Sequence, residues 1–213
     1  MKLTNKNIFL STSCINPNFF CYNNSEDRLQ ELLGTIESCK KIENSINVIF
    51  EGSHLTEIQK KNLEGECIIF EWNDDSEIQE AVRDKQRGTI NLMIKGYENI
   101  EVPEDSNIFF IAGRYRIANG FDLNNFNGDY VFKKRFKNDT REWLGVQLFK
   151  ISGKKIKEFL DILYLAKNYV YSGNDVETSI LMSLKSKGIY FIEIDMVHCE
   201  GFISGNKNHL ELH

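Results

Sequence analysis

Two arginines follow a run of apolar residues in the middle of the chain. Ile108–Ala112 are five consecutive apolar residues, and Gly113 then precedes Arg114 and Arg116. Such a run, ended by a glycine, is typical of a buried strand. Guanidinium groups at the carboxyl end of that strand would favour phosphate or carboxylate in the crevice where open α/β sheets bind ligands. The alternative is that one arginine pairs with a structural carboxylate and the other is solvated.

Three earlier apolar segments end in short polar loops, which are Ser11-Thr12-Ser13, Glu51-Gly52-Ser53 and Asn73-Asp74-Asp75. Parallel strands would bring these loops to one edge of a sheet. A ligand rich in hydroxyl and imide groups, such as uridine, suits them, because Glu51 or Asp75 can accept a hydrogen bond from a ribose hydroxyl or the uracil N–H. Ordinary polar loop chemistry is the other interpretation.

The basic segment Lys85-Gln-Arg-Gly88 precedes a predicted helix. Lys85 and Arg87 could approach a diphosphate there, where free backbone N–H groups and the helix dipole also favour anions. The chain has neither the P-loop pattern nor the glycine fingerprint of dinucleotide-binding folds. A solvated basic loop is the alternative.

Two carboxylates, Asp175 and Glu177, open another predicted helix. Asp175 can cap that helix, and negative charge in the first turn is stabilised. Either carboxylate could instead take a proton from a hydroxyl, which requires hydrogen-bond reach and an ionised state at neutral pH. His198 could bind a metal together with a carboxylate, or it is a surface histidine. No Cys/His dyad and no GxSxG elbow supports nucleophilic hydrolysis.

The first half of the chain predicts the element order βαβαβααβ, which implies a mainly parallel sheet with helices on both faces. The predicted strands are Asn7–Ser13, Ile46–Phe50, Cys67–Trp72 and Asn107–Ala112. The predicted helices are Ser25–Ile42, Thr56–Leu63, Ser76–Arg83 and Thr89–Asn99, with Ser25 and Ser76 as N-caps.

The second half predicts hairpin-like strands, so the sheet as a whole is expected to be mixed. Its predicted elements are strands Tyr130–Phe136 and Gly145–Ile151, helices Lys154–Tyr169 and Asp175–Leu184, strand Tyr190–Ile194 and a loosely ordered tail, Gly201–His213.

Composition limits the class of protein. The 213 residues are 41% hydrophobic, enough for one domain with a substantial core, and the net charge of −5 disfavours a broad nucleic-acid surface. No apolar stretch reaches the roughly 20 residues that span a bilayer, and the start of the chain has no signal-peptide pattern, so we expect a cytoplasmic protein. The five cysteines are scattered without a CxxC pair, which favours reduced thiols.

Taken in order, five segments resemble GT-A-fold glycosyltransferases, specifically the compact type encoded in bacterial surface-polysaccharide loci and by large DNA viruses. The segments are Arg28–Gly52, Lys85–Gly88 with the following helix, Ile111–Tyr115 with Phe121-Asp122, Asn174–Glu177 and Cys199–Ile203. They span nearly the whole chain.

The resemblance implies a single GT-A-like (Rossmann-like) α/β domain over residues 1–213, with a nucleotide-binding half (1–118) and an acceptor half (119–213). The donor would be a UDP-sugar, held by the loop residues above and by Lys85, Arg87, Arg114 and Tyr115, with Mn²⁺ or Mg²⁺ as the common cofactor. The acceptor would be a glycan or glycoprotein hydroxyl. Asp175 and Glu177 resemble the position of the catalytic base in inverting members.

One departure from the family pattern concerns the metal. GT-A enzymes usually carry Asp-x-Asp after the fourth strand, where this chain has Ala112-Gly-Arg-Tyr115. Either Arg114 replaces the metal charge at the diphosphate, or a metal is held by Asp74 or Asp75 with His198. A sugar nucleotidyltransferase and a non-catalytic nucleotide- or carbohydrate-binding domain of a larger enzyme are the alternative functions.

Overall fold

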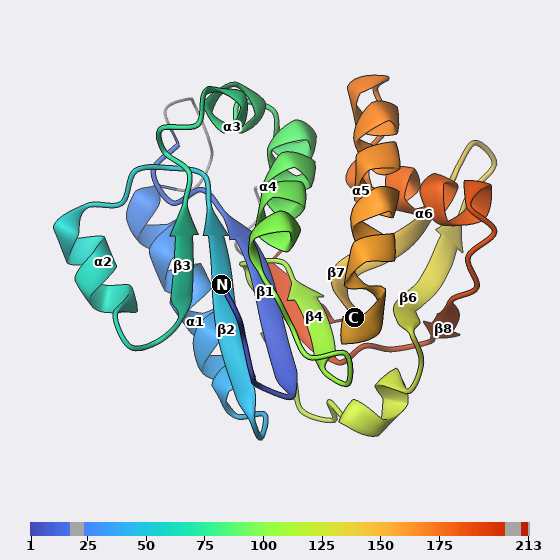
Figure 1. The fold of residues 1–213 in the computed structure, drawn as a ribbon, viewed down its shortest axis with the longest axis horizontal. Helices are drawn as coiled ribbons and strands as arrows, with labels where there is room; N and C mark the ends of the chain where they lie inside the picture. Colours follow the sequence, from blue (N-terminus) through green and yellow to red (C-terminus); the bar gives the residue numbers. More distant parts are fainter. Residues whose placement is uncertain (18–23, 203–209, 213) are drawn as a thin grey trace.

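A computed structural model describes residues 1–17, 24–202 and 210–212 (Figure 1). The first half contains β1 (Asn7–Ser13), α1 (Ser25–Lys40), β2 (Ser45–Glu51), α2 (Glu57–Leu63), β3 (Ile68–Glu71), α3 (Ser76–Ala81), α4 (Lys85–Asn99) and β4 (Asn107–Ile111). This is the predicted order βαβαβααβ, and the prediction is confirmed.

The second half begins with β5 (Tyr115–Ile117), a 3₁₀ turn η1 (Leu123–Phe126), β6 (Tyr130–Lys137) and β7 (Glu142–Ser152). It continues with a 3₁₀ turn η2 (Gly153–Lys155), α5 (Ile156–Tyr171), α6 (Val176–Ser186), β8 (Ile192–Ile194), β9 (Cys199–Phe202) and β10 (Leu210–Leu212).

Seven strands form the main sheet in the order β3-β2-β1-β4-β7-β6-β8. Parallel pairing joins β1 to β2 and β4, β2 to β3, and β6 to β8. Strand β7 runs antiparallel to both β4 and β6. The mixed, mainly parallel sheet therefore agrees with the prediction. The carboxyl ends of β1 to β3 point to the same edge, at the top of Figure 1.

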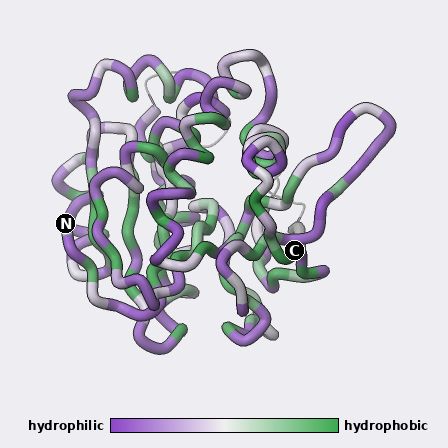
Figure 2. The backbone as a smooth tube through the Cα atoms, turned by 45° about the vertical axis from the view of Figure 1, so that its right-hand side comes forward, coloured by the Kyte–Doolittle hydropathy of each residue, from purple (hydrophilic) through white to green (hydrophobic). Residues whose placement is uncertain are grey.

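Apolar side chains cover both faces of this sheet. The largest core cluster joins the sheet to α4, α5 and α6, with Phe50, Tyr97 and Phe159 among its buried aromatic residues. The opposite face has two clusters, one with residues of α1 and α2 and one with residues of β5 and η1. Figure 2 shows hydrophobic residues along the central strands and hydrophilic ones in many outer connections.

A second, three-stranded sheet, β10-β9-β5, was not predicted. The expectation of a loosely ordered tail from Gly201 is wrong where the structure describes the tail, because Gly201 lies in β9 and residues 210–212 form β10. Residues 203–209 and 213 lie outside the described residues. The sequence signal failed because these strands are only three or four residues long.

Three helix starts differ from the prediction. Asn24 caps α1 and Asp75 caps α3, in place of Ser25 and Ser76. The helix predicted from Thr89 begins at Lys85, because Asp84 caps it. Thr56 caps α2 in a capping box with Gln59, as the sequence pattern indicates. Within the described ranges, none of the helices has the length and apolarity that crossing a bilayer requires.

Candidate functional site

Glu51 joins the loops that follow β1 and β2. It is fully buried, and its Oε1 accepts hydrogen bonds from the backbone N–H of Ile15 (3.1 Å) and Ser53 (2.8 Å) and from the Ser53 hydroxyl. Burial raises the pKa of Glu51, although hydrogen bonds from Ser53 and Ser13 act in the opposite direction. Through these hydrogen bonds, the buried carboxyl group fixes the backbone conformation of the two loops that are predicted to bind the nucleoside.

The three predicted loop residues of β1 have different surroundings. Ser11 is buried, and its hydroxyl donates to the carbonyl oxygen of Ile111 at 2.8 Å, so it joins β1 to β4. Thr12 and Ser13 are partly exposed at the carboxyl end of the strand. A Cβ at Gly113 would lie 3.3 Å from the Thr12 carbonyl oxygen, so the segment after β4 approaches β1 closely.

The two aspartates after β3, Asp74 and Asp75, differ in their surroundings. Asp75 accepts from the backbone N–H of Glu77 and Ile78 and pairs with Lys95 at 3.1 Å. These interactions outweigh burial and hold its pKa below the usual range. Asp74 is exposed. Asp75 is therefore occupied as a cap and ion-pair partner of α3 and α4.

The basic segment Lys85–Gly88 is the first turn of α4 and not a loop. The Asp84 carboxylate accepts from the backbone N–H of Gln86 (2.8 Å) and Arg87 (3.0 Å), so these two amides are already bonded. The side chains carry the positive charge of this turn. Arg87 lies over the ring of Tyr171, with its guanidinium carbon 4.8 Å from the ring centroid.

The two arginines after β4 separate. Arg116 lies on β5 against α1, where a Cβ at Gly34 would collide with its guanidinium. Arg114 stays at the carboxyl end of β4, 5.5 Å from the ring centroid of the buried Tyr115. The Arg114 Nε is buried and has no hydrogen-bond partner in the described part of the chain. A buried donor of this kind is costly unless something accepts from it.

Lys85, Arg114 and Glu177 form one electrostatic cluster. Loss of solvation lowers the pKa of Lys85, the neighbouring Arg114 lowers it further, and Glu177 raises it. Burial raises the pKa of Glu177, with Asp175 adding to the shift and Lys85 and Arg141 opposing it. The structure thus brings the start of α4, the end of β4 and the start of α6 together.

Asp175 differs from Glu177 because both of its oxygens are engaged. Oδ1 accepts from the backbone N–H of Thr178 at 2.8 Å and caps α6, and Oδ2 pairs with the Arg141 guanidinium. For Glu177, a half-buried residue, no ion pair is present among residues 1–17, 24–202 and 210–212. Of the two predicted bases, Glu177 is the one whose carboxylate is not occupied by a side chain from this described part of the chain.

The predicted metal ligands are not brought together. His198 precedes β9 with a φ of 52°, and its ring is close to Gly120, where a Cβ would lie 2.8 Å from Nδ1. No three His, Cys, Asp or Glu side chains among the described residues could hold a metal ion as a group. The set of Asp74, Asp75 and His198 is corrected accordingly. Ala112-Gly-Arg114, in the usual place of Asp-x-Asp, supplies no side-chain oxygen ligand.

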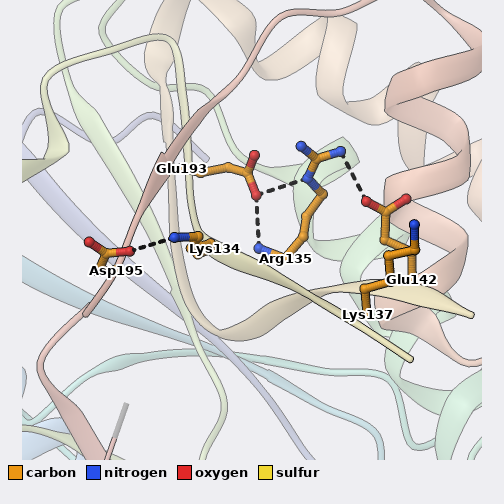
Figure 3. A pocket seen from close by; sticks show the side chains of 6 residues that line it. All are labelled: Lys134, Arg135, Lys137, Glu142, Glu193 and Asp195. Carbon is orange, nitrogen blue, oxygen red and sulfur yellow. Dashed lines mark hydrogen bonds and ion pairs between the residues drawn. The ribbon is translucent and has the colours of Figure 1, made fainter. Parts of the chain in front are cut away.

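A pocket of about 260 Å³ lies elsewhere, between β6, β7 and β8 (Figure 3). Arg135 contacts Glu142 at 3.1 Å and Glu193 at 2.9 Å, and Lys134 contacts Asp195 at 3.2 Å. Its charges are therefore largely neutralised by one another, as in a surface ion-pair network. This pocket is at the far end of the sheet from β1 to β3.

Two residues that organise the site were not predicted. Gln86 and Arg141 both reach the start of α6, from positions 90 and 34 residues away in the chain. No local pattern marks such contacts. Only the predicted topology, which brings α4 and the β6–β7 hairpin to one edge, could have suggested them.

Comparisons with known proteins identify the fold. No family model and no curated protein matches the chain. Among solved structures, the bifunctional glycosyltransferase WbbM is similar at a TM-score of 0.53 and 8% identity, covering 89% of this chain and 39% of that one. Core-mannan synthase A from Aspergillus fumigatus, in its Mn/GDP form, is similar at 0.50 and 10% identity, covering 87% and 72%. A transferase is similar at 0.50 and 10%, covering 91% and 93%.

The chain thus spans about two fifths of the length of WbbM. At these identities the likeness concerns the fold alone, which is a single GT-A-like α/β domain. The predicted fold class is confirmed.

Proposed function

We propose that this chain is a glycosyltransferase that moves a hexose or deoxyhexose from a UDP-sugar to a hydroxyl of a glycan or glycoprotein. The observation that carries the proposal is the cluster of Lys85, Arg114 and Glu177 at the carboxyl edge of a GT-A-like sheet. It combines two cations for a diphosphate with one carboxylate of raised pKa. In this proposal, residues 1–118 bind the nucleotide and residues 119–213 bind the acceptor.

The nucleoside binds at the ends of β1 and β2. Thr12 and Ser13 offer partly exposed polar groups, while the buried Glu51 holds the loops in position. Ser11 and Asp75 support this edge through their contacts with β4 and α4. The diphosphate then lies between Lys85 and Arg114, with Tyr115 packed below and Arg87 at the rim.

In the transfer step, Glu177 accepts the proton of the acceptor hydroxyl. The hydroxyl oxygen forms a bond to the sugar C1 while the bond from C1 to the diphosphate oxygen breaks, which inverts C1 and releases UDP. Lys85 and Arg114 stabilise the negative charge that develops on the leaving diphosphate, and preorganised charge of this kind is usually the largest catalytic term. Asp175 acts indirectly, by capping α6 and holding Arg141.

The mechanism proceeds without a metal step. Core-mannan synthase A is described in an Mn/GDP form, but the residues of this chain do not fit a divalent cation after β4. Arg114 supplies positive charge at that place. The UDP specificity, the acceptor and an origin in a virus or a polysaccharide locus are parts of the proposal that follow from the sequence resemblance.

A thermal-shift panel of UDP-, GDP-, CMP- and dTDP-sugars, each with EDTA or Mn²⁺, tests the proposal. A ligand at 100 times its Kd stabilises the folded state by about 2.7 kcal/mol, which for a domain of this size is a rise of roughly 5–10 °C in Tm. We expect UDP-sugars to give this rise in EDTA, and UDP to be released when an acceptor is added.

Other outcomes select the alternatives. Release of pyrophosphate from UTP and a sugar phosphate would identify a nucleotidyltransferase. Binding of UDP without turnover of any UDP-sugar would identify a non-catalytic binding domain. No rise in Tm with any nucleotide would contradict the glycosyltransferase, the nucleotidyltransferase and a nucleotide-binding domain, and would leave only a carbohydrate-binding domain.

A further inference from the structure

The β6–β7 hairpin has two chemically different faces near its tip. Phe136 and Trp143 are paired across the strands, and their rings stack with centroids 5.7 Å apart and an interplanar angle of 21°. The neighbouring Arg135, Lys137 and Glu142 line the charged pocket on the other side (Figure 3). Both aromatic rings belong to partly exposed residues. The hairpin therefore presents an aromatic surface next to solvent.

The face of β7 that carries Trp143 continues toward the middle of the strand. Leu144 is buried in the core cluster that contains α6, so the alternation of a strand directs Trp143 and Gly145 to the opposite face. A Cβ at Gly145 would lie 3.0 Å from the Cβ of Lys133 and 3.1 Å from the Gln147 Oε1. Trp143, Gly145 and Gln147 thus form one strip, in which the side chains of Lys133 and Gln147 already fill the place beside the glycine.

The inner end of the strip reaches the proposed donor site. The Gln147 carbonyl oxygen accepts from the backbone N–H of Ala112 at 3.0 Å, two residues before Arg114. The Gln147 Oε1 is buried and has no hydrogen-bond partner in the described ranges. An amide oxygen in this state is costly, and a hydroxyl group placed on the strip would supply the missing donor.

The outer end of the strip reaches the proposed base. The Arg141 guanidinium carbon lies 4.3 Å from the centroid of the Trp143 ring, and the same guanidinium pairs with Asp175, two residues before Glu177. The Arg141 side chain is about half exposed, at 48%. A contact between a cation and an aromatic ring at an exposed site is weak, so another ligand of the indole face can displace it.

We propose that Trp143 and Gln147, on one face of β7, form the platform that binds the acceptor sugar. A pyranose ring stacks its C–H face on the indole in place of Arg141 and donates a hydroxyl hydrogen bond to the Gln147 Oε1. The inference deepens the proposed function and depends on it for the role of the sugar as acceptor. The platform itself is a carbohydrate-binding site.

Tryptophan fluorescence tests the platform directly. The chain has two tryptophans, so Trp72→Phe leaves Trp143 as the only reporter, and the change keeps the aromatic packing of Trp72 against Phe50 and Phe70. The probes are the methyl pyranosides of glucose, galactose, mannose and N-acetylglucosamine. We expect at least one of them to change the Trp143 emission saturably, and saturation-transfer NMR to place the sugar C–H protons against an aromatic ring.

Substitutions on the platform should weaken saccharide binding, whereas removal of Arg141 should strengthen it. Trp143→Ala and Gln147→Leu should each remove or strongly weaken the NMR signal, with Trp143→Phe keeping part of it. Arg141→Ala should increase affinity by about two- to five-fold, because it removes a competitor of exposed cation–π strength. Tyr190→Ala is the matched control, since Tyr190 is 84% exposed and its ring is not on the strip; it should change nothing.

Failure of this inference is separable from failure of the proposed function. UDP-sugar turnover with no saccharide response, or with a response that Trp143→Ala and Gln147→Leu leave unchanged, would overturn the platform alone. A Trp143-dependent saccharide response without any UDP binding would overturn the glycosyltransferase and retain the platform. If Trp143→Ala does not fold, Gln147→Leu and Arg141→Ala decide the question.

Discussion

The Gln86 side-chain oxygen accepts a hydrogen bond from the backbone N–H of Val176 at 2.9 Å, which joins the first turns of α4 and α6. Lys85 precedes the acceptor of this bond and Glu177 follows its donor. The cation proposed for the diphosphate and the proposed base are therefore held together by one hydrogen bond between residues 90 positions apart. The contact positions the cluster without needing to touch a substrate.

Gln86→Leu should lower kcat by about tenfold or more, because small displacements of catalytic groups are costly. The change leaves the Val176 N–H without its acceptor and frees Glu177 to move. Steady-state kinetics with a UDP-sugar measure the effect. Gln30→Leu, at an exposed position on α1, is the matched control and should keep wild-type kcat. Equal kcat in the two variants would show that the hydrogen bond does not position the site.

Glu177→Gln should abolish most transfer, whereas Asp175→Asn should retain a larger share of it, since an amide oxygen can still cap α6. When kcat of the wild type is plotted against pH, the pKa that describes the acid limb should be higher than the ordinary glutamate pKa of about 4.3, because burial raises the pKa of Glu177. A pH series of kcat for the wild type and both variants measures this. A larger loss in Asp175→Asn would reassign the base to Asp175.

The same raised pKa predicts the sign of a stability change. The folded state holds the Glu177 proton more tightly than the unfolded state, so wild-type stability decreases as pH rises through the folded pKa. Glu177→Gln lacks this loss. Its Tm should exceed that of the wild type at pH 7 to 8, with the difference shrinking as pH falls below about 4.3. Calorimetry across this range would contradict the account if the variant were less stable at neutral pH.

Glu51→Ala should destabilise the fold by at least about 2 kcal/mol, because the buried N–H groups of Ile15 and Ser53 lose their acceptor. Glu51→Gln keeps one oxygen and should cost less. Chemical denaturation of the two variants measures the difference. UDP affinity should follow the same order, since these loops are the proposed nucleoside site. Wild-type UDP affinity in a folded Glu51→Ala protein would place the nucleoside elsewhere.

Arg114→Ala should reduce turnover by roughly 10²–10³-fold, the usual cost of losing one preorganised group that stabilises a leaving charge. Arg116→Ala is the matched control, since that arginine lies on β5 beside α1. It should leave kcat nearly unchanged. Initial-rate measurements on both variants test whether the two neighbouring arginines have separate roles.

Much of the fold was predictable because it follows from strong local periodicity. Strand β1 was predicted with its observed bounds, and the long helices α1 and α5 were predicted to within two residues at each end. The short strands β5, β9 and β10 were missed because three or four residues carry no reliable period. The helix α4 was started too late, since the basic residues of its first turn concealed the Asp84 cap.

The candidate site was only partly predictable. Arg114, Lys85 and Glu177 were identified from residue type and position, and the topology brings them together. The sequence could not show that Asp175 forms an ion pair with Arg141 or that Asp75 forms one with Lys95. It also could not show that the Arg116 side chain packs against α1. Each of these depends on long-range contacts that no local pattern encodes. The roles of all these residues, and the cytoplasmic location, stay predictions.

Calorimetric titration of the wild type and of Arg114→Met with UDP and with uridine tests the central claim most directly. If Arg114 and Lys85 bind the diphosphate, the wild type should bind UDP at least about tenfold more tightly than uridine, as expected for a charge-assisted contact of about 1.4 kcal/mol or more. That difference should largely disappear in Arg114→Met, with uridine affinity retained. The same preference for UDP over uridine in both proteins would contradict the account.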